Sequence, residues 1–203
     1  EQTHGNSEKR LWKNHAALLI KVERMFRELF MVLLLFGLTF QVVPSVDADV
    51  TSENDVKAAY IFNFAKFVEW PEKAFASKSS PIVLCVLGDD SMGDALQNLE
   101  SKKIKGRPLT VVRLRSKEQI RSCHILYISE SEKKEISDIL SKMGGRPCLT
   151  VSSVNEFAAQ GGMIGFVRKG NKVRFEVNPE AVRRAELAVS SRLLNLAIIV
   201  REP

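Results

Sequence analysis

Histidine and cysteine are scarce in this chain, and their scarcity limits the chemistry that it can perform. The 203 residues include only 3 His and 3 Cys, too few cysteines for a disulfide-dense miniprotein. Because His4 and His15 lie near the start, His124 is the only histidine of residues 49–203. No His-x-x-x-His or Cys-x-x-Cys spacing occurs, so the common zinc motifs are absent. A hydrolase would have to be built around His124, which makes it the weakest of the functional hypotheses.

Long apolar runs are also rare, and the longest one lies near the N-terminus. Phe30–Phe40 is apolar over eleven residues, whereas a membrane-spanning helix needs about 20. Basic residues precede this run, and the small residues Val46 and Ala48 follow it. This order is typical of a secretory signal peptide. We therefore expect cleavage after Ala48 and export to the periplasm. No cysteine stands at the cleavage site, so a lipoprotein signal is not indicated.

These features predict three segments. Met25 is a candidate start, which makes residues 1–24 an extension outside the translated protein and residues 25–48 the leader. Residues 49–203 are then a single domain of ordinary globular composition, since 45% of the whole chain is hydrophobic and 27% is charged. The net charge is +6, but the basic residues are scattered among acidic ones. No nucleic-acid-binding arm is therefore indicated.

Predicted strands and helices alternate through most of the domain. We expect strands at 81–87, 109–114, 124–128 and 148–151 and helices at 56–70, 94–101 and 133–143. Gly-Arg-Pro occurs at both 106–108 and 145–147, where Gly would end a helix and Pro would begin a strand. Two such β-α-β units predict a largely parallel, doubly wound (Rossmann-like) α/β sheet with helices on both faces.

The C-terminal third predicts a different arrangement. After a short helix at 155–160, the segments 163–167 and 172–177 flank Gly170-Asn171, a pair that favours a two-residue hairpin turn. We therefore expect an antiparallel hairpin at the edge of the sheet. Two further helices are expected at 179–187 and 191–200.

The predicted helix 56–70 carries aromatic residues on more than one side. The stripe that contains Phe64 is expected to face the core. Phe62 projects instead on the polar side near Lys66, and Trp70 lies at the edge of the stripe. Two interpretations remain open: a second layer of structure covers Phe62, or Phe62, Lys66 and Trp70 form a partner surface.

One of the three cysteines lies within the first predicted strand and another at the entrance of the third, and a 2-1-3 order would place these strands side by side. These cysteines are Cys85 and Cys123, and an oxidising compartment would allow them to form a disulfide. That bond would contribute about 3 to 4 kcal/mol in the chain-entropy description. The alternatives are two buried thiols, or a zinc site that adds His124 and Cys148. Cys148 is otherwise expected to be buried rather than reactive.

The loop Gly88–Gly93 follows the first predicted strand and precedes a helix. Ligands of α/β sheets bind at this place. The loop matches neither the Walker A pattern nor Gly-x-Gly-x-x-Gly. It is therefore either a capped turn or the crevice of a periplasmic small-ligand-binding module, which is our second functional hypothesis.

Several segments together resemble the YfiR family of periplasmic proteins, also called DUF4154. The resemblance covers 55–200 and lies in residues 58–71, 82–89, 105–108, 175–178 and 190–194. The most specific of these is Ala58–Pro71 (AAYIFNFAKFVEWP).

The resemblance implies a regulator that is not an enzyme and that needs no cofactor or metal. Members bind the periplasmic sensory domain of an inner-membrane diguanylate cyclase and restrain it, which lowers cyclic di-GMP and biofilm formation. An OmpA-like outer-membrane lipoprotein sequesters the repressor and relieves the restraint. Members are homodimers with disulfides; the pair Cys85 and Cys123 is present here, but residues 155–166 lack the second pair of some members.

Overall fold

The computed structural model describes residue 27, residues 52–89 and residues 92–201. The predicted cleavage site after Ala48 lies outside the described residues, so export and the domain boundary stay predictions. In the described part of the chain, no helix has the length and hydrophobicity needed to cross a membrane.

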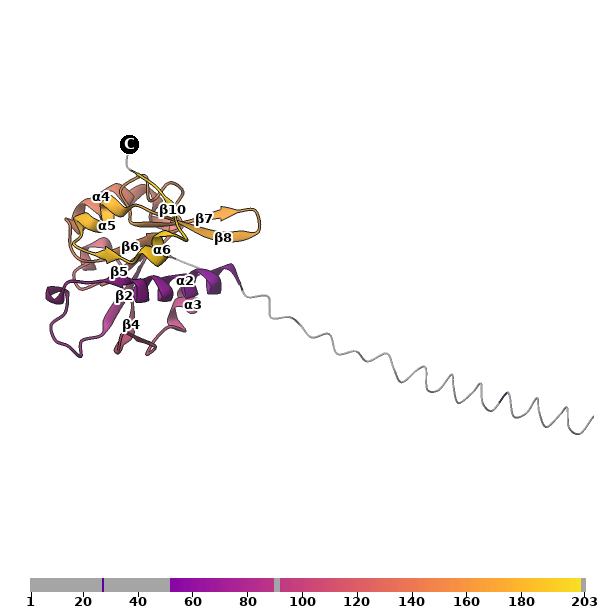
Figure 1. Ribbon diagram of the computed structural model, residues 1–203, viewed down its shortest axis with the longest axis horizontal. Coiled ribbons are helices and arrows are strands. Elements are labelled where there is room, and N and C mark those ends of the chain that lie inside the picture. The colour runs from indigo at the N-terminus through magenta and orange to yellow at the C-terminus, as the bar shows by residue number, and fades with distance from the viewer. Residues whose placement is uncertain (1–26, 28–51, 90–91, 202–203) are drawn as a thin grey trace, which may run out of the picture. The chain divides into compact units, whose positions relative to one another are not determined.

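The described residues from 52 onward form a mixed α/β fold around one eight-stranded sheet (Figure 1). Its spatial order is β10-β8-β7-β6-β5-β2-β4-β3. The strands of this sheet are β2 (Ile82–Leu87), β3 (Lys103–Ile104), β4 (Arg107–Leu114), β5 (Ile125–Ile128), β6 (Leu149–Ser152), β7 (Ile164–Lys169), β8 (Lys172–Val177) and β10 (Ile198–Ile199).

Pairing in this sheet is parallel from β4 through β2, β5 and β6 to β7. The pairs β7–β8 and β3–β4 are antiparallel, and β10 runs parallel to β8. The predicted α/β class is therefore confirmed. The sheet is mixed rather than parallel throughout, so the doubly wound, Rossmann-like detail is not.

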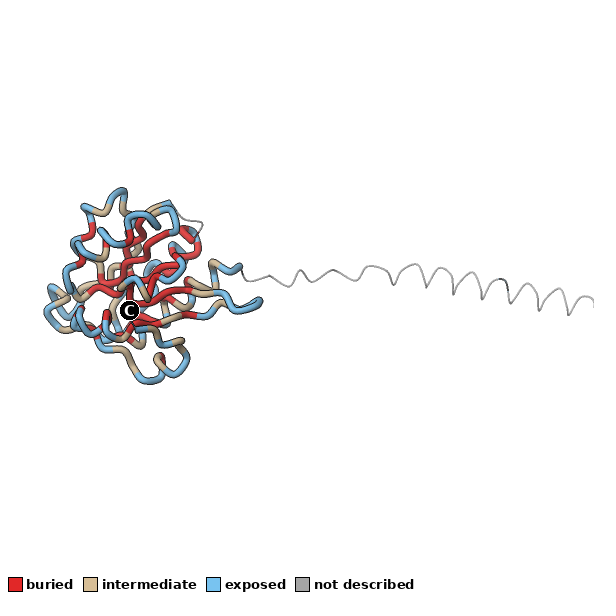
Figure 2. Tube along the Cα trace, turned by 90° about the horizontal axis from the view of Figure 1, so that it is seen from above, coloured by how far each residue is buried: buried red, intermediate tan, exposed pale blue. Residues whose placement is uncertain are grey.

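The apolar sequence of β2 explains its central place, because both faces of a strand between two parallel neighbours are buried. Leu84 and Val86 belong to the hydrophobic cluster on one face. Cys85 and Leu87 belong to the cluster on the other. The buried segments run through the middle of the domain in Figure 2. Helices cover both clusters, as predicted.

Helix α2 (Glu53–Phe67) covers the first face and contacts α3, α6, β3 and β8. It begins at Ser52, whose side chain accepts a hydrogen bond from the Asp55 N–H at 3.1 Å. It ends three residues before Trp70, because Val68–Glu69 form strand β1 and pair with β9 (Ala188–Val189). The helix predicted at 56–70 is correct in type and displaced toward the N-terminus.

Phe64 of α2 forms the centre of an aromatic cluster on the hairpin β7–β8. Its ring centroid lies 4.9 Å from that of Phe175, 5.9 Å from that of Phe166 and 5.8 Å from that of Tyr60. Phe64 is fully buried. These contacts join the first helix of the domain to a hairpin that follows it by about a hundred residues in the sequence.

Helix α4 (Ile136–Met143) covers the second face with Ile136, Ile139 and Met143. It follows the 3₁₀ helix η3 (Glu130–Glu135) and ends at Gly144, which adopts the left-handed conformation. The other short helices are η1 (Glu72–Ala74), α3 (Gly93–Gln97), η2 (Lys117–Gln119), α5 (Pro179–Arg184) and α6 (Ser191–Leu194).

Three predictions for the C-terminal part are wrong. The segment 155–160 forms turns rather than a helix. The helix expected at 191–200 stops after one turn as α6, and Ile198–Ile199 then pair with β8 as β10. The hairpin β7–β8 forms as expected, but β10 rather than β8 is the outermost strand. Two β-branched residues beside an open sheet edge favour pairing over a second helical turn.

Candidate functional site

The structure places the predicted surface residues in two neighbouring features rather than one. Phe62 and Lys66 lie on α2, and the Lys66 ammonium sits 4.2 Å from the centre of the Phe62 ring. A second ammonium, that of Lys102, lies 5.8 Å from the same ring. Phe62 is partly buried against the first cluster. It is therefore neither covered by a second layer nor fully exposed, and its ring is flanked by two cations. We call these three residues the Phe62 surface.

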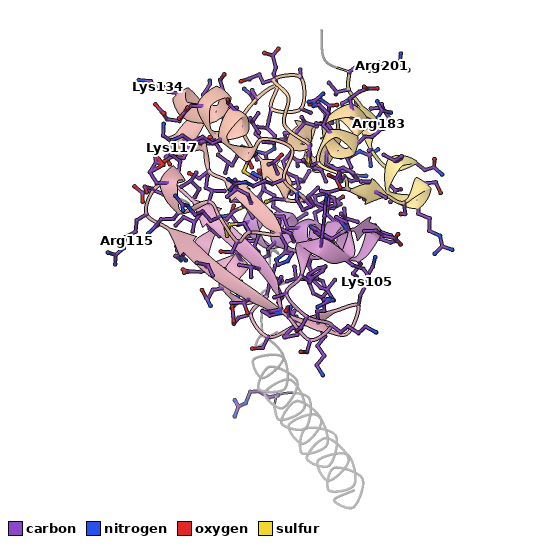
Figure 3. The ribbon with its side chains drawn as sticks, turned by 90° about the vertical axis from the view of Figure 1, so that its left-hand side faces the viewer. Lys105, Arg115, Lys117, Lys134, Arg183 and Arg201 are labelled. Atoms are coloured by element: carbon purple, nitrogen blue, oxygen red, sulfur yellow. A yellow bond between two sulfur atoms is a disulfide. The ribbon has the colours of Figure 1, made fainter. Side chains whose placement is uncertain are left out.

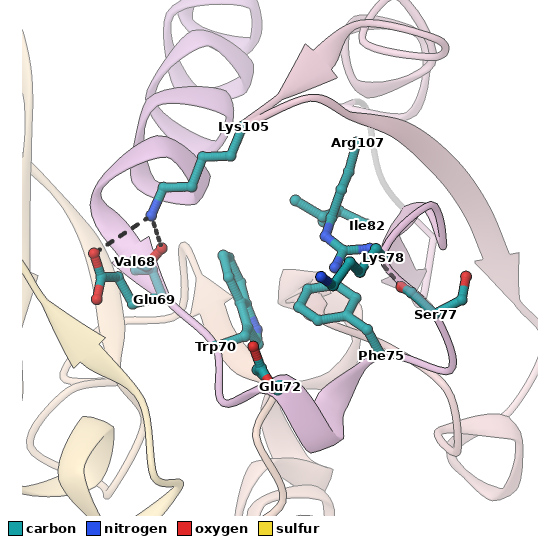
Figure 4. A pocket seen from close by; sticks show the side chains of 10 residues that line it. All are labelled: Val68, Glu69, Trp70, Glu72, Phe75, Ser77, Lys78, Ile82, Lys105 and Arg107. Atoms are coloured by element: carbon teal, nitrogen blue, oxygen red, sulfur yellow. Dashed lines mark hydrogen bonds and ion pairs between the residues drawn. The ribbon is translucent and has the colours of Figure 1, made fainter.

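Trp70 belongs to a separate cleft. Its indole N–H donates to the His124 carbonyl at 3.1 Å, which fixes the ring at the end of β1. The cleft has a volume of about 440 Å³, within the range of small-ligand pockets. It is drawn in Figure 4 and lined by Val68, Glu69, Trp70, Glu72, Phe75, Ser77, Lys78, Ile82, Lys105 and Arg107. We call it the Trp70 cleft.

Arg107 holds the loop that forms one wall of the Trp70 cleft. Its Nη1 donates to the carbonyls of Ser77 and Ser80 at 2.9 and 2.8 Å. Its guanidinium also lies 3.8 Å from the centre of the Phe75 ring. One side chain, that of Arg107, therefore contacts the loop 75–80 at three residues.

Lys105 reaches over the other wall of the cleft from the turn between β3 and β4. Its ammonium donates to the Val68 carbonyl at 3.0 Å and lies 3.9 Å from a Glu69 carboxylate oxygen. Lys105 and Gly106 have positive φ angles of 50° and 84°, the conformation of a tight hairpin turn. The turn was predicted as the end of a helix, and Lys105 and Arg107 were not predicted as site residues.

His124 acts as a structural tie between the sheet and the wall of the cleft. The Val83 N–H donates to its Nδ1 at 3.1 Å, and its Nε2 lies 3.0 Å from the Ala74 carbonyl. The ring stacks on Phe75 with centroids 4.5 Å apart. Since a carbonyl only accepts, Nε2 carries the proton and Nδ1 is bare. Both nitrogens bond to main-chain atoms, which gives no support to a Ser-His-Asp hydrolase.

Burial lowers the pKa of His124 below its ordinary value of 6.5, and the nearby Arg107 charge acts in the same direction. The unfolded chain therefore binds the proton more tightly, so the free energy of unfolding should fall as the pH drops below about 6.5. We expect His124→Gln to lose this part of the pH dependence, as measured by urea unfolding.

A chain with His4→Gln and His15→Gln retains only His124. Its imidazole NMR signals should then titrate with a midpoint below 6.5. A midpoint at or above that value would show that His124 is not buried as described.

The cysteines follow the prediction. Cys85 and Cys123 form a disulfide with Cα atoms 5.7 Å apart. Cys148 is a buried free thiol, and burial raises its pKa, so it is not ionised at neutral pH. The disulfide rules out the zinc site considered for Cys85, Cys123, His124 and Cys148. No group of metal-ligating side chains occurs among the described residues.

The loop after β2 is closed by side chains of its neighbours. The Ser129 hydroxyl donates to the Asp89 carbonyl at 2.9 Å, and the Asp89 N–H donates to Ser131 Oγ at 3.0 Å. Gly88 has a φ of 88°, and a Cβ there would lie 2.5 Å from Ser131 Oγ. These contacts are those of a capped turn, and residues 90–91 lie outside the described part.

The basic side chains are distributed over the domain. Figure 3 labels Lys105, Arg115, Lys117, Lys134, Arg183 and Arg201, which come from different parts of the chain. Several are paired with acids, as Lys117 is with Glu135 at 2.6 Å and with Asp138.

Fold and site together define a mixed α/β domain with a disulfide between strand β2 and the loop before β5, a cationic-aromatic surface and a small cleft. The chain is similar in fold to a conserved domain protein from Vibrio cholerae O1 biovar El Tor, with a TM-score of 0.53 at 9% identity. The match covers 74% of this chain and 60% of that one. The sequence profile of the YfiR/HmsC-like family (DUF4154) matches residues 54–198. The chain belongs to this family.

Proposed function

We propose that this protein is a periplasmic regulator that binds the sensory domain of an inner-membrane diguanylate cyclase and restrains the cyclase. The observation that carries the proposal is membership of the YfiR/HmsC-like family over residues 54–198, a family of regulators rather than catalysts. The signal-peptide pattern before residue 49 and the disulfide support a periplasmic location. Lower cyclic di-GMP and less biofilm follow from the restraint.

The restraint needs only a difference in affinity. If the protein binds the inactive arrangement of the sensory domain better than the active one, it shifts the cyclase toward the inactive state. A difference of about 3 kcal/mol changes the ratio of the two states about 150-fold. No chemical step by the regulator is required.

The Phe62 surface is the proposed contact with the sensory domain. Phe62 offers a partly buried aromatic ring on a rigid helix, and Lys66 and Lys102 supply positive charge around it. Aromatic side chains in such surroundings dominate many interfaces. The charges favour an acidic surface on the partner. The proposal also includes a homodimer and an OmpA-like outer-membrane lipoprotein that sequesters the regulator and releases the cyclase.

The proposal predicts that deletion of the gene raises cyclic di-GMP and biofilm, and that the wild-type gene restores both. In a titrated expression series, Phe62→Ala should need at least tenfold more protein than the wild type to restore both levels, because the main contact is removed. Val112→Ala, which changes an exposed apolar residue of β4 away from α2, is the control and should complement fully. Unchanged cyclic di-GMP on deletion, or failure of any membrane cyclase to co-purify with the wild-type protein, would contradict the proposal.

A small-ligand-binding periplasmic module is the second candidate function. The Trp70 cleft supports it, whereas the loop after β2 is closed by Ser129 and Ser131.

A further inference from the structure

Arg107 is a partly buried cation without a carboxylate partner among the described residues. Its hydrogen bonds go to two main-chain carbonyls, and both start from Nη1. The guanidinium has five N–H donors in a planar fork. Nε and Nη2 therefore retain donors that no described protein group accepts. A guanidinium with such donors can pair with an anion, because two parallel N–H groups match the two oxygens of a carboxylate.

The aromatic rings of the cleft differ in what they offer to a ligand. Phe75 stacks with the Arg107 guanidinium at 3.8 Å and with the His124 ring at 4.5 Å. Two groups at these distances must occupy opposite faces of the Phe75 ring, so neither face is open to a ligand. Trp70 is held through the N–H at the edge of its indole, and this hydrogen bond does not cover a face of the ring. In Figure 4 this ring is seen nearly edge-on, with the cavity between it and the wall of Phe75 and Arg107.

The charges around the cleft limit the ligand to a small net charge. Lys78 is exposed and has no carboxylate partner among the described residues, and Lys105 adds a second ammonium. Glu69 is held near Lys105, and Glu72 lies at the rim. Three cations face two carboxylates, so one further negative charge balances the cleft, while a multiply charged anion would be repelled by the glutamates.

We propose that the Trp70 cleft binds a small monocarboxylate attached to a six-membered ring that can stack on an indole. The carboxylate pairs with the free edge of the Arg107 guanidinium, and the ring lies against the open face of Trp70. Lys78 and Lys105 attract the anion to the mouth of the cleft. An aromatic acid and a sugar acid share a carboxylate joined to such a ring, so the ring type is decided by experiment. This inference does not depend on the regulatory function.

Tryptophan fluorescence reports on this cleft directly. The sequence has two tryptophans, Trp12 and Trp70, so the full chain with Trp12→Phe has one emitter, in the cleft. Benzoate and glucuronate serve as the two probes, and we expect saturable changes in Trp70 emission with at least one of them. Benzamide, which keeps the ring of benzoate without its charge, and inorganic phosphate, which lacks a ring, should bind at least tenfold more weakly. Equal binding of benzamide, or no saturable change with either acid, would overturn the inference.

Substitutions then test the assigned roles. Arg107→Gln should weaken binding of the better probe at least tenfold, because Gln can still donate to a loop carbonyl but carries no charge. Lys78→Gln leaves every contact of the loop described here in place and should weaken binding about twofold to fivefold. Lys103→Gln, an exposed cation of β3 outside the cleft, is the matched control and should change nothing. Thermal unfolding checks that each variant is folded.

If Arg107→Gln does not fold, the decision rests on Lys78→Gln against Lys103→Gln at low salt, where the attraction by exposed charges is least screened. Equal affinities of those two variants would overturn the inference. Because the assay uses purified protein without a cyclase, its failure would leave the regulatory proposal untouched.

Discussion

Replacing Phe64 by alanine should lower the free energy of unfolding by about 3 to 5 kcal/mol. The ring is completely buried and contacts Tyr60, Phe166 and Phe175. Its removal leaves a cavity between α2 and the hairpin β7–β8, whose backbones are fixed by the helix and by the sheet. The lost contacts also include aromatic pairs, which add stability beyond the buried area. Urea unfolding followed by circular dichroism measures the change.

Phe62→Ala is the matched control on the same helix. Phe62 is only partly buried, and its ring faces two ammonium groups. The truncation should therefore cost about 1 kcal/mol, of which the cation–π contacts account for a large share. A loss as large as that of Phe64→Ala would show that Phe62 is a core residue. The Phe62 surface would then no longer be a separate docking feature.

The contrast between these two residues was predictable from sequence, but the partner of Phe64 was not. Helical spacing alone places Phe64 and Phe62 on different sides of α2. Nothing in that spacing identifies Phe166 and Phe175 as the residues opposite Phe64. That contact joins segments about a hundred residues apart, and long-range packing is set by the whole sheet order rather than by a local pattern.

The strand order itself was partly predictable. A continuous apolar run and two β-α-β units indicated the parallel centre of the sheet, and β2 indeed lies between β4 and β5. The ends were not predicted, because edge pairing needs only two residues. β3 and β10 each contain two, and a segment this short carries no periodicity to detect.

The Trp70 cleft was only partly predictable for a related reason. Trp70 was singled out as a surface residue, but Lys105 lies in a hairpin turn that was predicted as a helix end, and Arg107 begins β4 directly after that turn. The available signal was the dipeptide Lys105-Gly106, since consecutive positive φ angles at a tight turn are typical with Gly in the second place. The role of His124 as a tie could not be predicted, because its partners are main-chain atoms of two other segments.

Reduction of the disulfide should lower the free energy of unfolding by about 3 to 4 kcal/mol. Cys85 and Cys123 are separated by 38 residues, so the bond removes much of the freedom of the unfolded chain. The folded state loses little, because β2 and β5 remain paired next to both cysteines through Leu84 and Ile125. Urea unfolding with and without a reductant measures the effect, and Cys85→Ala with Cys123→Ala should reproduce most of it.

Cys148→Ala is the control that separates the bond from thiol exchange. The Cys148 thiol is buried and its pKa is raised, so it forms little of the thiolate that attacks disulfides. On reduction, the free energy of unfolding of the variant should therefore fall by about 3 to 4 kcal/mol, as it does in the wild type. If instead reduction had no effect in Cys148→Ala, the third cysteine would be part of the stabilising bond, and the pairing of Cys85 with Cys123 would be wrong. A second disulfide within this chain cannot compensate, since Cys148 is the only cysteine left. The whole covalent contribution therefore depends on one bond between β2 and the loop that leads into β5.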